Sequence, residues 1–388
     1  MLAQKDHIIE NAGDQVAGDK YIVEKINDGY AAIGRGARLI VKNAISYAEE
    51  KQELKQLEQA QLARSVAKLA QSLESQAKPF AVRERNPYKN IDYYDISDAG
   101  RFYGRQEIRD QLLANLICSN SRCRLVVLHG EVGFGKTSLL RAGVMPLLVA
   151  NGHLPLFVRV TTSSLTKSIM KSLFPEITET TDLKNASLQS FLRQVATILG
   201  PEKGIFILLD QFEHFFDASE EQRSEFLKEL DDCLNDPTTG TSWLICVRSS
   251  RLGYLNVFQQ IDRQPSTNSA VLGPLARNDA RQAVNKPAQD AGFSVETELS
   301  EVLLDDLGGE IIEPVSLQIV CHTLVELLPD EEKKLTLQHY TEAGRAGGIL
   351  RNYLDLILEH NLVEEDRDKG WKVLDAVDDL GPAKTTIV

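Results

Sequence analysis

A glycine-rich loop carries the strongest chemical signal in the sequence. It reads Gly130-Glu-Val-Gly-Phe-Gly135-Lys136-Thr137, follows an apolar run at Leu125 to Leu128 and precedes a helix-forming stretch at Ser138 to Ala150. Glycines let such a loop turn its backbone N–H groups toward phosphate oxygens, and the positive end of the following helix dipole adds to the attraction. Strand, loop and helix in this order predict a binding site for a purine nucleoside triphosphate.

Two side chains of this P-loop would complete the site. We expect Lys136 to neutralise the β- and γ-phosphates and Thr137 to offer its hydroxyl to Mg²⁺, a cation that prefers oxygen ligands. ATP or ADP with Mg²⁺ is therefore the predicted cofactor. The cofactor-binding residues predicted from this run are Gly130, Glu131, Val132, Gly133, Phe134, Gly135, Lys136, Thr137 and Ser138.

A second apolar run, Ile205 to Leu209, ends in the carboxylate of Asp210. A carboxylate at a strand end beside the P-loop can hold Mg²⁺ directly or through water, so Thr137 and Asp210 are the predicted metal ligands. A buried strand followed by an Asp that caps a helix would show the same pattern, and this is the alternative interpretation.

The residues after this strand bear on hydrolysis. Gln211 stands where many hydrolysing P-loop ATPases place a Glu that polarises the attacking water, and Glu213 is the candidate to take over that role. Capping or ion pairing is the alternative role for Glu213. Arg248 ends the run Trp243 to Val247 at the sheet edge where ligands bind, and either Arg248 or Arg251 could contact the γ-phosphate. We therefore predict Glu213 and Arg248 as catalytic residues of a slow ATPase.

Upstream of the P-loop, Phe102-Tyr103-Gly104-Arg105 precedes a helix expected to begin near Gln106. An aromatic pair followed by Gly allows close packing on a purine ring, although a plain turn at the entry of a domain explains the same residues. Tyr103, Gly104 and Arg105 are accordingly further predicted cofactor-binding residues.

The rest of the chain must position these groups. From Arg101 to residue 277, strand-like and helix-like segments alternate, which predicts an α/β domain with a parallel sheet flanked by helices. Residues 278–345 are helical in pattern and predict a lid domain, in which Pro314 suits the first position of a helix. The expected strands are Leu125 to Leu128, Leu156 to Val160, Ile205 to Leu209, Trp243 to Val247 and Ala270 to Leu272.

The first 100 residues divide into three parts. Residues 1–36 are rich in Gly and Asp and predict short strands joined by turns, and residues 78–100, with Pro79 and Pro87, predict a linker. Residues 37–77 contain no Gly or Pro and predict one long helix. Its apolar residues step by four, three and four, so the helix either lies on its own domain or self-associates as a coiled coil. These residues are Leu62, Val66, Leu69 and Leu73.

Composition excludes several classes of protein. The formal net charge of −13 argues against nucleic acid as the main ligand, and the five scattered cysteines lack the close pairs of a zinc site. No apolar run approaches the roughly 20 residues of a membrane span, and the charged start of the chain is unlike a signal peptide. A cytoplasmic protein with reduced thiols is expected.

Together these motifs resemble a STAND-class NTPase, the group of signal-transducing P-loop ATPases that includes NLR-type immune sensors, and in particular its bacterial novel STAND subgroup. The resemblance covers about residues 100–388. It is carried by Phe-Tyr-Gly-Arg at 102–105, the P-loop, Leu-Asp-Gln-Phe-Glu at 209–213, the strand end at Arg248, and a helical stretch with Lys286-Pro287-Ala288 and Glu313-Pro314.

The resemblance implies a nucleotide-controlled switch of bacterial defence or stress signalling, in which exchange of ADP for ATP opens the lid and drives homo-oligomerisation. It adds Pro314 of the lid to the cofactor-binding residues and implies that residues 346–388 begin a truncated winged-helix domain. An effector or sensor protein, or a missing carboxy-terminal sensor region, is the implied partner. His214 replaces an acid that is common in the subgroup, and Ser249 and Ser250 replace a frequent Asp; these departures bear on hydrolysis.

Two other classes of function remain open at this point. A working motor or loader ATPase of the AAA+ type would turn over rapidly in the presence of its substrate, and the acidic charge of the chain counts against DNA as that substrate. A scaffold whose nucleotide is permanently bound and structural is the other alternative.

Overall fold

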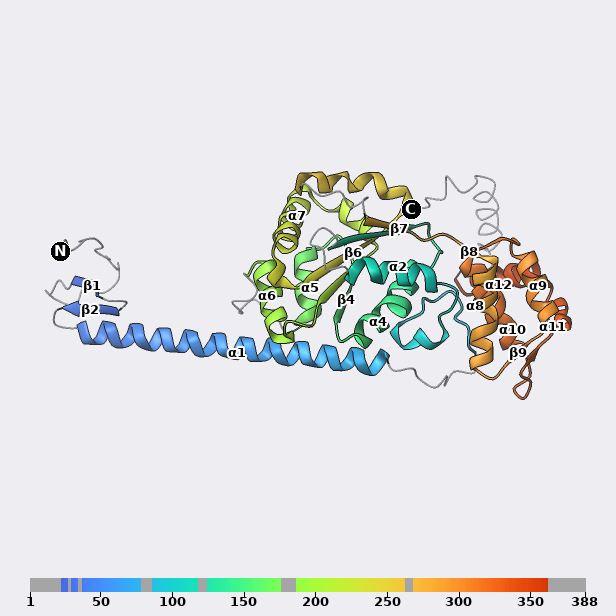
Figure 1. Cartoon of the computed structure of the whole chain (residues 1–388), viewed down its shortest axis with the longest axis horizontal. Coiled ribbons are helices and arrows are strands. Elements are labelled where there is room, and N and C mark those ends of the chain that lie inside the picture. The colour runs from blue at the N-terminus through green and yellow to red at the C-terminus, as the bar shows by residue number, and fades with distance from the viewer. Residues whose placement is uncertain are drawn as a thin grey trace.

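The computed structural model describes residues 22–26, 29–33, 37–77, 86–117, 124–175, 186–261 and 268–361 (Figure 1). The expected start of a winged helix beyond residue 361 lies outside the described residues, as do residues 1–21 of the leader. None of the helices in the described part of the chain has both the length and the hydrophobicity needed to cross a bilayer.

The nucleotide-binding domain is built on a parallel sheet, as the alternating pattern predicts. Its five strands lie in the order β4-β5-β6-β3-β7, so the P-loop strand β3 has β6 on one side and β7 on the other. The strands are β3 (Leu125–Gly130), β4 (Leu154–Arg159), β5 (Ile205–Asp210), β6 (Thr241–Arg248) and β7 (Ser269–Val271).

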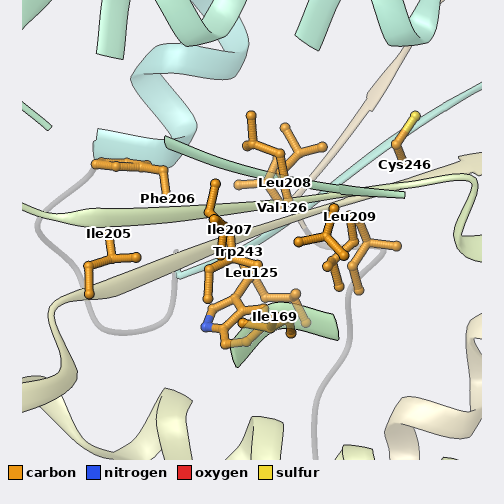
Figure 2. Packing of buried hydrophobic residues seen from close by; sticks show 14 of the residues in the cluster. Leu125, Val126, Ile169, Ile205, Phe206, Ile207, Leu208, Leu209, Trp243 and Cys246 are labelled. Atoms are coloured by element: carbon orange, nitrogen blue, oxygen red, sulfur yellow. The ribbon is translucent and has the colours of Figure 1, made fainter. Parts of the chain in front are cut away.

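Both faces of the sheet are covered, which explains why its strands are apolar throughout instead of alternating. Figure 2 shows Phe206 and Cys246 on one side of the strands and Trp243 with Ile169 on the other, and all four are at most 4% exposed. The flanking helices include α2 (Gln106–Ile117), α5 (Leu165–Leu173), α6 (Leu188–Leu199) and α7 (Glu220–Asn235).

The helix after the P-loop begins at Lys136, two residues earlier than the pattern predicts, and it is not uniform. A first turn, α3 (Lys136–Ser138), continues into a π-helical turn at Leu139–Val144 and then into α4 (Met145–Ala150). The wide turn ends just before Pro146, which has no N–H for the regular hydrogen bond to the residue four positions earlier.

The long helix α1 (Ala37–Ala77) has the predicted bounds. Leu62 and Val66 are at most 1% exposed and belong to the core of the nucleotide-binding domain, so this half of the helix lies on its own domain. The amino-terminal half runs past the globular part toward the hairpin of β1 (Ile22–Ile26) and β2 (Gly29–Ile33) (Figure 1).

The lid lies at the opposite end of the domain from that hairpin (Figure 1). It is not purely helical, because two short strand pairs join its helices: β8 (Leu275–Ala276) with β10 (Ile311–Ile312), and β9 (Ser294–Val295) with β11 (Lys334–Leu335). Its helices are α8 (Arg277–Asp290), α9 (Thr297–Asp306), α10 (Pro314–Glu326), α11 (Leu337–Glu342) and α12 (Arg345–Asn361).

Two features differ from the domain bounds expected from sequence. Ala346 and Ile349 of α12 are buried in the core of the lid, so this helix belongs to the lid and does not start a separate domain. Residues 86–101, most of which were expected to be linker, pack into the molecule: Tyr88 lies in the lid core and Ile96 in the core of the nucleotide-binding domain. We call residues 86–101 the strap.

Candidate nucleotide-binding site

A cavity of about 320 Å³ lies between the nucleotide-binding domain and the lid. On one side it is lined by the P-loop and by the carboxyl ends of β4, β5 and β6. On the other side it is lined by the strap and by the first turns of α10. Ligands of open parallel sheets bind at this edge, so the cavity lies where the topology predicts.

The P-loop has the backbone that its glycines allow. Gly133 and Gly135 have φ of +84° and +87°, in the left-handed region that other residues rarely adopt. Lys136 Nζ donates to the carbonyl oxygens of Gly130 and Glu131, both at 2.8 Å, so the ammonium is held at the mouth of the loop. A loop of this shape, followed by a helix N-terminus, can accept the phosphates of a nucleotide.

The two predicted metal ligands meet. Thr137 Oγ1 donates to Asp210 Oδ2 at 2.9 Å, and Asp210 is 1% exposed at the end of β5. They come together because only β6 separates β5 from β3 in the sheet, although 73 residues separate them in the chain. A hydroxyl and a carboxylate are the hard oxygen donors that suit Mg²⁺, an ion that keeps several of its own waters.

The two predicted catalytic residues also meet. Arg248 Nε donates to Glu213 Oε1 at 2.7 Å, while the other carboxylate oxygen, Oε2, is buried with no hydrogen-bond partner among the described residues. Gln211 adopts φ of +56° and turns the chain into the short helix Phe212–Asp217, which brings Glu213 to the cavity.

His214 takes no part in this arrangement. Its Nδ1 lies 3.7 Å from Asp217 Oδ2, and both side chains are well exposed. Arg251 does not line the cavity either, and its guanidinium lies over the ring of Tyr254 at 5.1 Å. Arg248 is thus the one of the two candidate arginines that reaches the site.

A family model for novel STAND NTPases, nSTAND1, matches residues 87–386. The chain belongs to this family. Membership implies nucleotide binding and agrees with the resemblance drawn from the motifs. None of the curated proteins compared with the chain matches it.

Solved structures similar to this STAND NTPase are P-loop proteins of low sequence identity. The Walker-type ATPase PABY2304 of Pyrococcus abyssi is 16% identical, with a TM-score of 0.48, and the match covers 76% of this chain and 81% of that one. The Orc1 protein of Aeropyrum pernix, solved in complex with DNA, is 13% identical, with a TM-score of 0.44 and coverage of 67% and 68%. PCH-2 of C. elegans is 13% identical, with a TM-score of 0.39 and coverage of 69% and 72%.

In this STAND NTPase the motif before α2, residues 102–105, contacts both the lid and the P-loop. Gly104 has φ of +81°, and a Cβ there would lie 2.4 Å from the carbonyl oxygen of Asp279 in α8, so the glycine permits close approach of the lid helix. Tyr103 Oη donates to Asp290 Oδ2 at 2.5 Å, and this hydrogen bond raises the pKa of Tyr103 to about 12. Gly104 thus has a packing role at the lid, and it is not among the residues that line the cavity, whereas Tyr103 and Arg105 are; nucleotide binding by this motif stays a prediction.

Arg105 connects the P-loop to residues 273 and 274 by hydrogen bonds. Its guanidinium donates to the carbonyl oxygens of Phe134 at 3.0 Å, Gly273 at 2.8 Å and Pro274 at 3.2 Å. Burial lowers the pKa of Arg105 to about 10. These three bonds let Arg105 position the loop, and Arg105 also lines the cavity, so its predicted contact with the nucleotide stays a prediction.

Several cavity residues escaped the sequence analysis. They are Asn90 to Tyr94 of the strap, Arg159 at the end of β4, and Val315 and Gln318 of α10, next to the predicted Pro314. The strap residues carry no recognisable motif. Arg159, in contrast, ends its strand as Asp210 and Arg248 end theirs, so the strand-end rule that identified those two would have identified it.

Proposed function

We propose that this protein is a nucleotide-controlled switch, in which the bound nucleotide, ATP or ADP with Mg²⁺, sets the position of the lid relative to the nucleotide-binding domain. One observation carries the proposal: a single cavity is walled by the P-loop on one side and by the strap and α10 on the other. A ligand bound there contacts both the nucleotide-binding domain and the lid. If the ligand binds the closed form and the open form of the protein with different affinities, it shifts the equilibrium between these forms.

Tyr94 supports the coupling. Its backbone N–H donates to Ser138 Oγ at 3.1 Å, in the first turn after the P-loop, and its hydroxyl donates to Gln318 Oε1 of α10 at 2.5 Å. Tyr94 is buried, its bond to Ser138 is buried, and its bond to Gln318 is partly buried. A shift of the P-loop helix would thereby reach the lid through one residue, whose backbone contacts Ser138 and whose side chain contacts Gln318.

Within the switch, Thr137 and Asp210 would hold Mg²⁺, which supplies charge neutralisation at the phosphates. Glu213 is the carboxylate available to accept a proton from an attacking water, since Gln211 is not a base. The ion pair with Arg248 keeps one oxygen of Glu213 occupied, and slow hydrolysis is the expected result. A slowly hydrolysing site suits a switch better than a motor.

We further propose that the open form self-associates through the amino-terminal half of α1, where Leu54 and Leu57 are about half exposed. Bacterial defence signalling is the context proposed for this assembly, with an effector or sensor protein as partner, because the motifs resemble those of signalling NTPases.

The decisive experiment compares Lys136→Ala with the wild type. Because Lys136 is the cation of the loop, we expect affinity for ADP and for a non-hydrolysable ATP analogue to fall by at least about 30-fold. Fluorescent-nucleotide titration measures binding, and light scattering measures the mass of the protein without nucleotide, with ADP and with the analogue. The wild type should change mass between the two nucleotides, and the variant should not.

Lys171→Ala is the matched control, since Lys171 is an exposed lysine of α5 outside the cavity. Circular dichroism should show that both variants are folded. Unchanged nucleotide affinity in folded Lys136→Ala, or a wild-type mass that ignores the nucleotide, would end the switch proposal.

A further inference from the structure

Five cationic side chains in the described part of the chain line the cavity. Four of them already have strong partners. Arg101 donates to Asp98, Arg105 to three backbone carbonyls, Lys136 to two loop carbonyls and Arg248 to Glu213. The fifth is Arg159, for which the structure shows neither an acid nor a carbonyl partner among the described residues.

Arg159 occupies a defined place at the sheet edge. It is the last residue of β4 and pairs in register with Asp210 of β5, so the two side chains leave the sheet on the same face. Neighbouring strands lie about 4.8 Å apart, which puts Arg159 directly beside the carboxylate that meets Thr137. Since β4 is the strand farthest from β3 on that side, Arg159 stands beyond Asp210 as seen from the P-loop.

Among the described residues, the interaction shown for the guanidinium of Arg159 is with an aromatic face. Its Cζ lies 6.0 Å from the centre of the Tyr93 ring. Tyr93 belongs to the strap, and the neighbouring Asp95 is fixed by a two-pronged bond from Arg141 at 2.8 and 2.7 Å. Arg141 also lies over the Tyr93 ring, with its Cζ at 5.3 Å from the centre. A guanidinium beside an aromatic face can keep N–H groups available for a further ligand.

The charge of the ligand indicates what Arg159 could bind. A nucleoside triphosphate brings more negative charge than a diphosphate, and that charge lies on the phosphate farthest from the base. Arg248 is already paired with Glu213 through its Nε, whereas Arg159 has no ion pair with an acid among the described residues. Arginine is also suited to phosphate, because its planar fork can donate two parallel hydrogen bonds.

We propose that Arg159 binds the terminal phosphate of a nucleoside triphosphate and thereby makes the site distinguish ATP from ADP. The inference rests on the proposed function, because it assigns a role within the same cavity. Because Tyr93 of the strap lies next to Arg159, binding of the terminal phosphate by Arg159 would affect the strap. A purely structural stack of Arg159 on Tyr93 is the competing explanation.

The test is the ratio of two dissociation constants. In the full chain with Mg²⁺, we expect Arg159→Ala to weaken binding of a non-hydrolysable ATP analogue by about 10- to 100-fold, because a charge-assisted pair of hydrogen bonds is lost. ADP affinity should stay within about threefold of wild type. Arg159→Lys, which keeps the charge and loses the fork, should fall between the two.

Arg251→Ala is the matched control, because Arg251 also lies over a tyrosine ring but outside the cavity. It should leave both affinities unchanged. Equal loss of ATP analogue and ADP in Arg159→Ala, or no loss of either in a variant that melts like the wild type, would overturn the inference.

Lys136→Ala, measured in parallel, separates the two proposals. If Lys136→Ala loses both nucleotides while Arg159→Ala loses neither, the role of Arg159 is wrong and nucleotide binding by the P-loop stands. If the wild type binds neither nucleotide, both proposals are wrong.

Discussion

At the scale of single residues, the ion pair of Glu213 with Arg248 determines what the site can catalyse. Glu213 is only 9% exposed, and a buried carboxylate oxygen without a partner is unfavourable, so Oε2 is ready to accept a hydrogen bond. A water in the cavity can make that bond. Arg248, whose side chain is 44% exposed, can leave Glu213 for a phosphate at a lower cost than a buried residue could.

Glu213→Gln tests this assignment. The amide keeps the shape and can still accept from Arg248, but it cannot take up a proton. We expect the rate of ATP hydrolysis to fall by about 10²- to 10⁴-fold with nucleotide affinity retained. A single-turnover assay with enzyme in excess detects even slow hydrolysis by the wild type.

Asp217→Asn is the control for that experiment, since Asp217 belongs to the same short helix and its carboxylate is 60% exposed. Its rate should match the wild type. Equal rates in the Glu213→Gln variant and the wild type would show that another group serves as the base.

The place of a residue in the site could be predicted where it depends on the residue's position at a strand end. It could not be predicted where it depends on a partner far away in the sequence. The P-loop, Asp210 and Arg248 each follow a strand, and the rule that parallel strands end at one edge brings them together. The close approach of Gly104 to the backbone of Asp279 could not be predicted, because the two residues are 175 positions apart and leave no local signature. The same holds for Tyr94, whose partner Gln318 comes from the lid.

At the scale of elements, α1 shows how one periodic pattern can serve two structures. Apolar residues stepping by four and three suit a coiled coil as well as a helix on a domain surface, and only the tertiary partner decides between them. In this protein Leu62 and Val66 face the nucleotide-binding domain, whereas Leu57 and Leu54 lie about one and two turns before Leu62 and are exposed.

Two substitutions by Asp test whether these two parts of α1 have different roles. Val66→Asp places an unpaired carboxylate in a core position, so we expect the free energy of unfolding to fall by roughly 3 kcal/mol or more. Leu57→Asp, on the exposed part of the same helix, should change that free energy by no more than about 0.5 kcal/mol. Chemical denaturation gives both values.

Light scattering on the same proteins tests the assembly proposed for the exposed part. Leu57→Asp should reduce the mass found with the ATP analogue. If Val66→Asp instead lowered the mass while leaving the unfolding transition in place, the buried seam would be an interface between copies.

At the scale of the whole molecule, the lid is attached to the nucleotide-binding domain by contacts in and around the cavity wall. The strap reaches both cores, Tyr103 bonds to Asp290 of α8, and Gly104 lets the backbone of α8 come close. In the proposed switch, the lid would move relative to the P-loop by changing these contacts. A switch needs contacts that can change, because a ligand can shift only an equilibrium between two states that both exist.

Gly104→Ala tests whether the close approach of α8 holds the two bodies together. A Cβ would lie 2.4 Å from the carbonyl oxygen of Asp279, and φ of +81° is also unfavourable for Ala. Gly152→Ala has the unfavourable backbone angle without the close contact, since Gly152 has φ of +78° and nothing within 4 Å of the added carbon. We expect about 1–2 kcal/mol of destabilisation for Gly152→Ala and a further ~1–3 kcal/mol for Gly104→Ala.

The difference between the two alanine variants isolates the docking of the lid from backbone strain. Only Gly104→Ala should make the connection between the domains sensitive to limited proteolysis and weaken binding of ADP, because the α10 wall of the cavity moves away. If the two variants proved equally stable and bound ADP equally well, the approach of α8 to Gly104 would not be what holds the lid, and the strap alone would have to carry the coupling between nucleotide and lid.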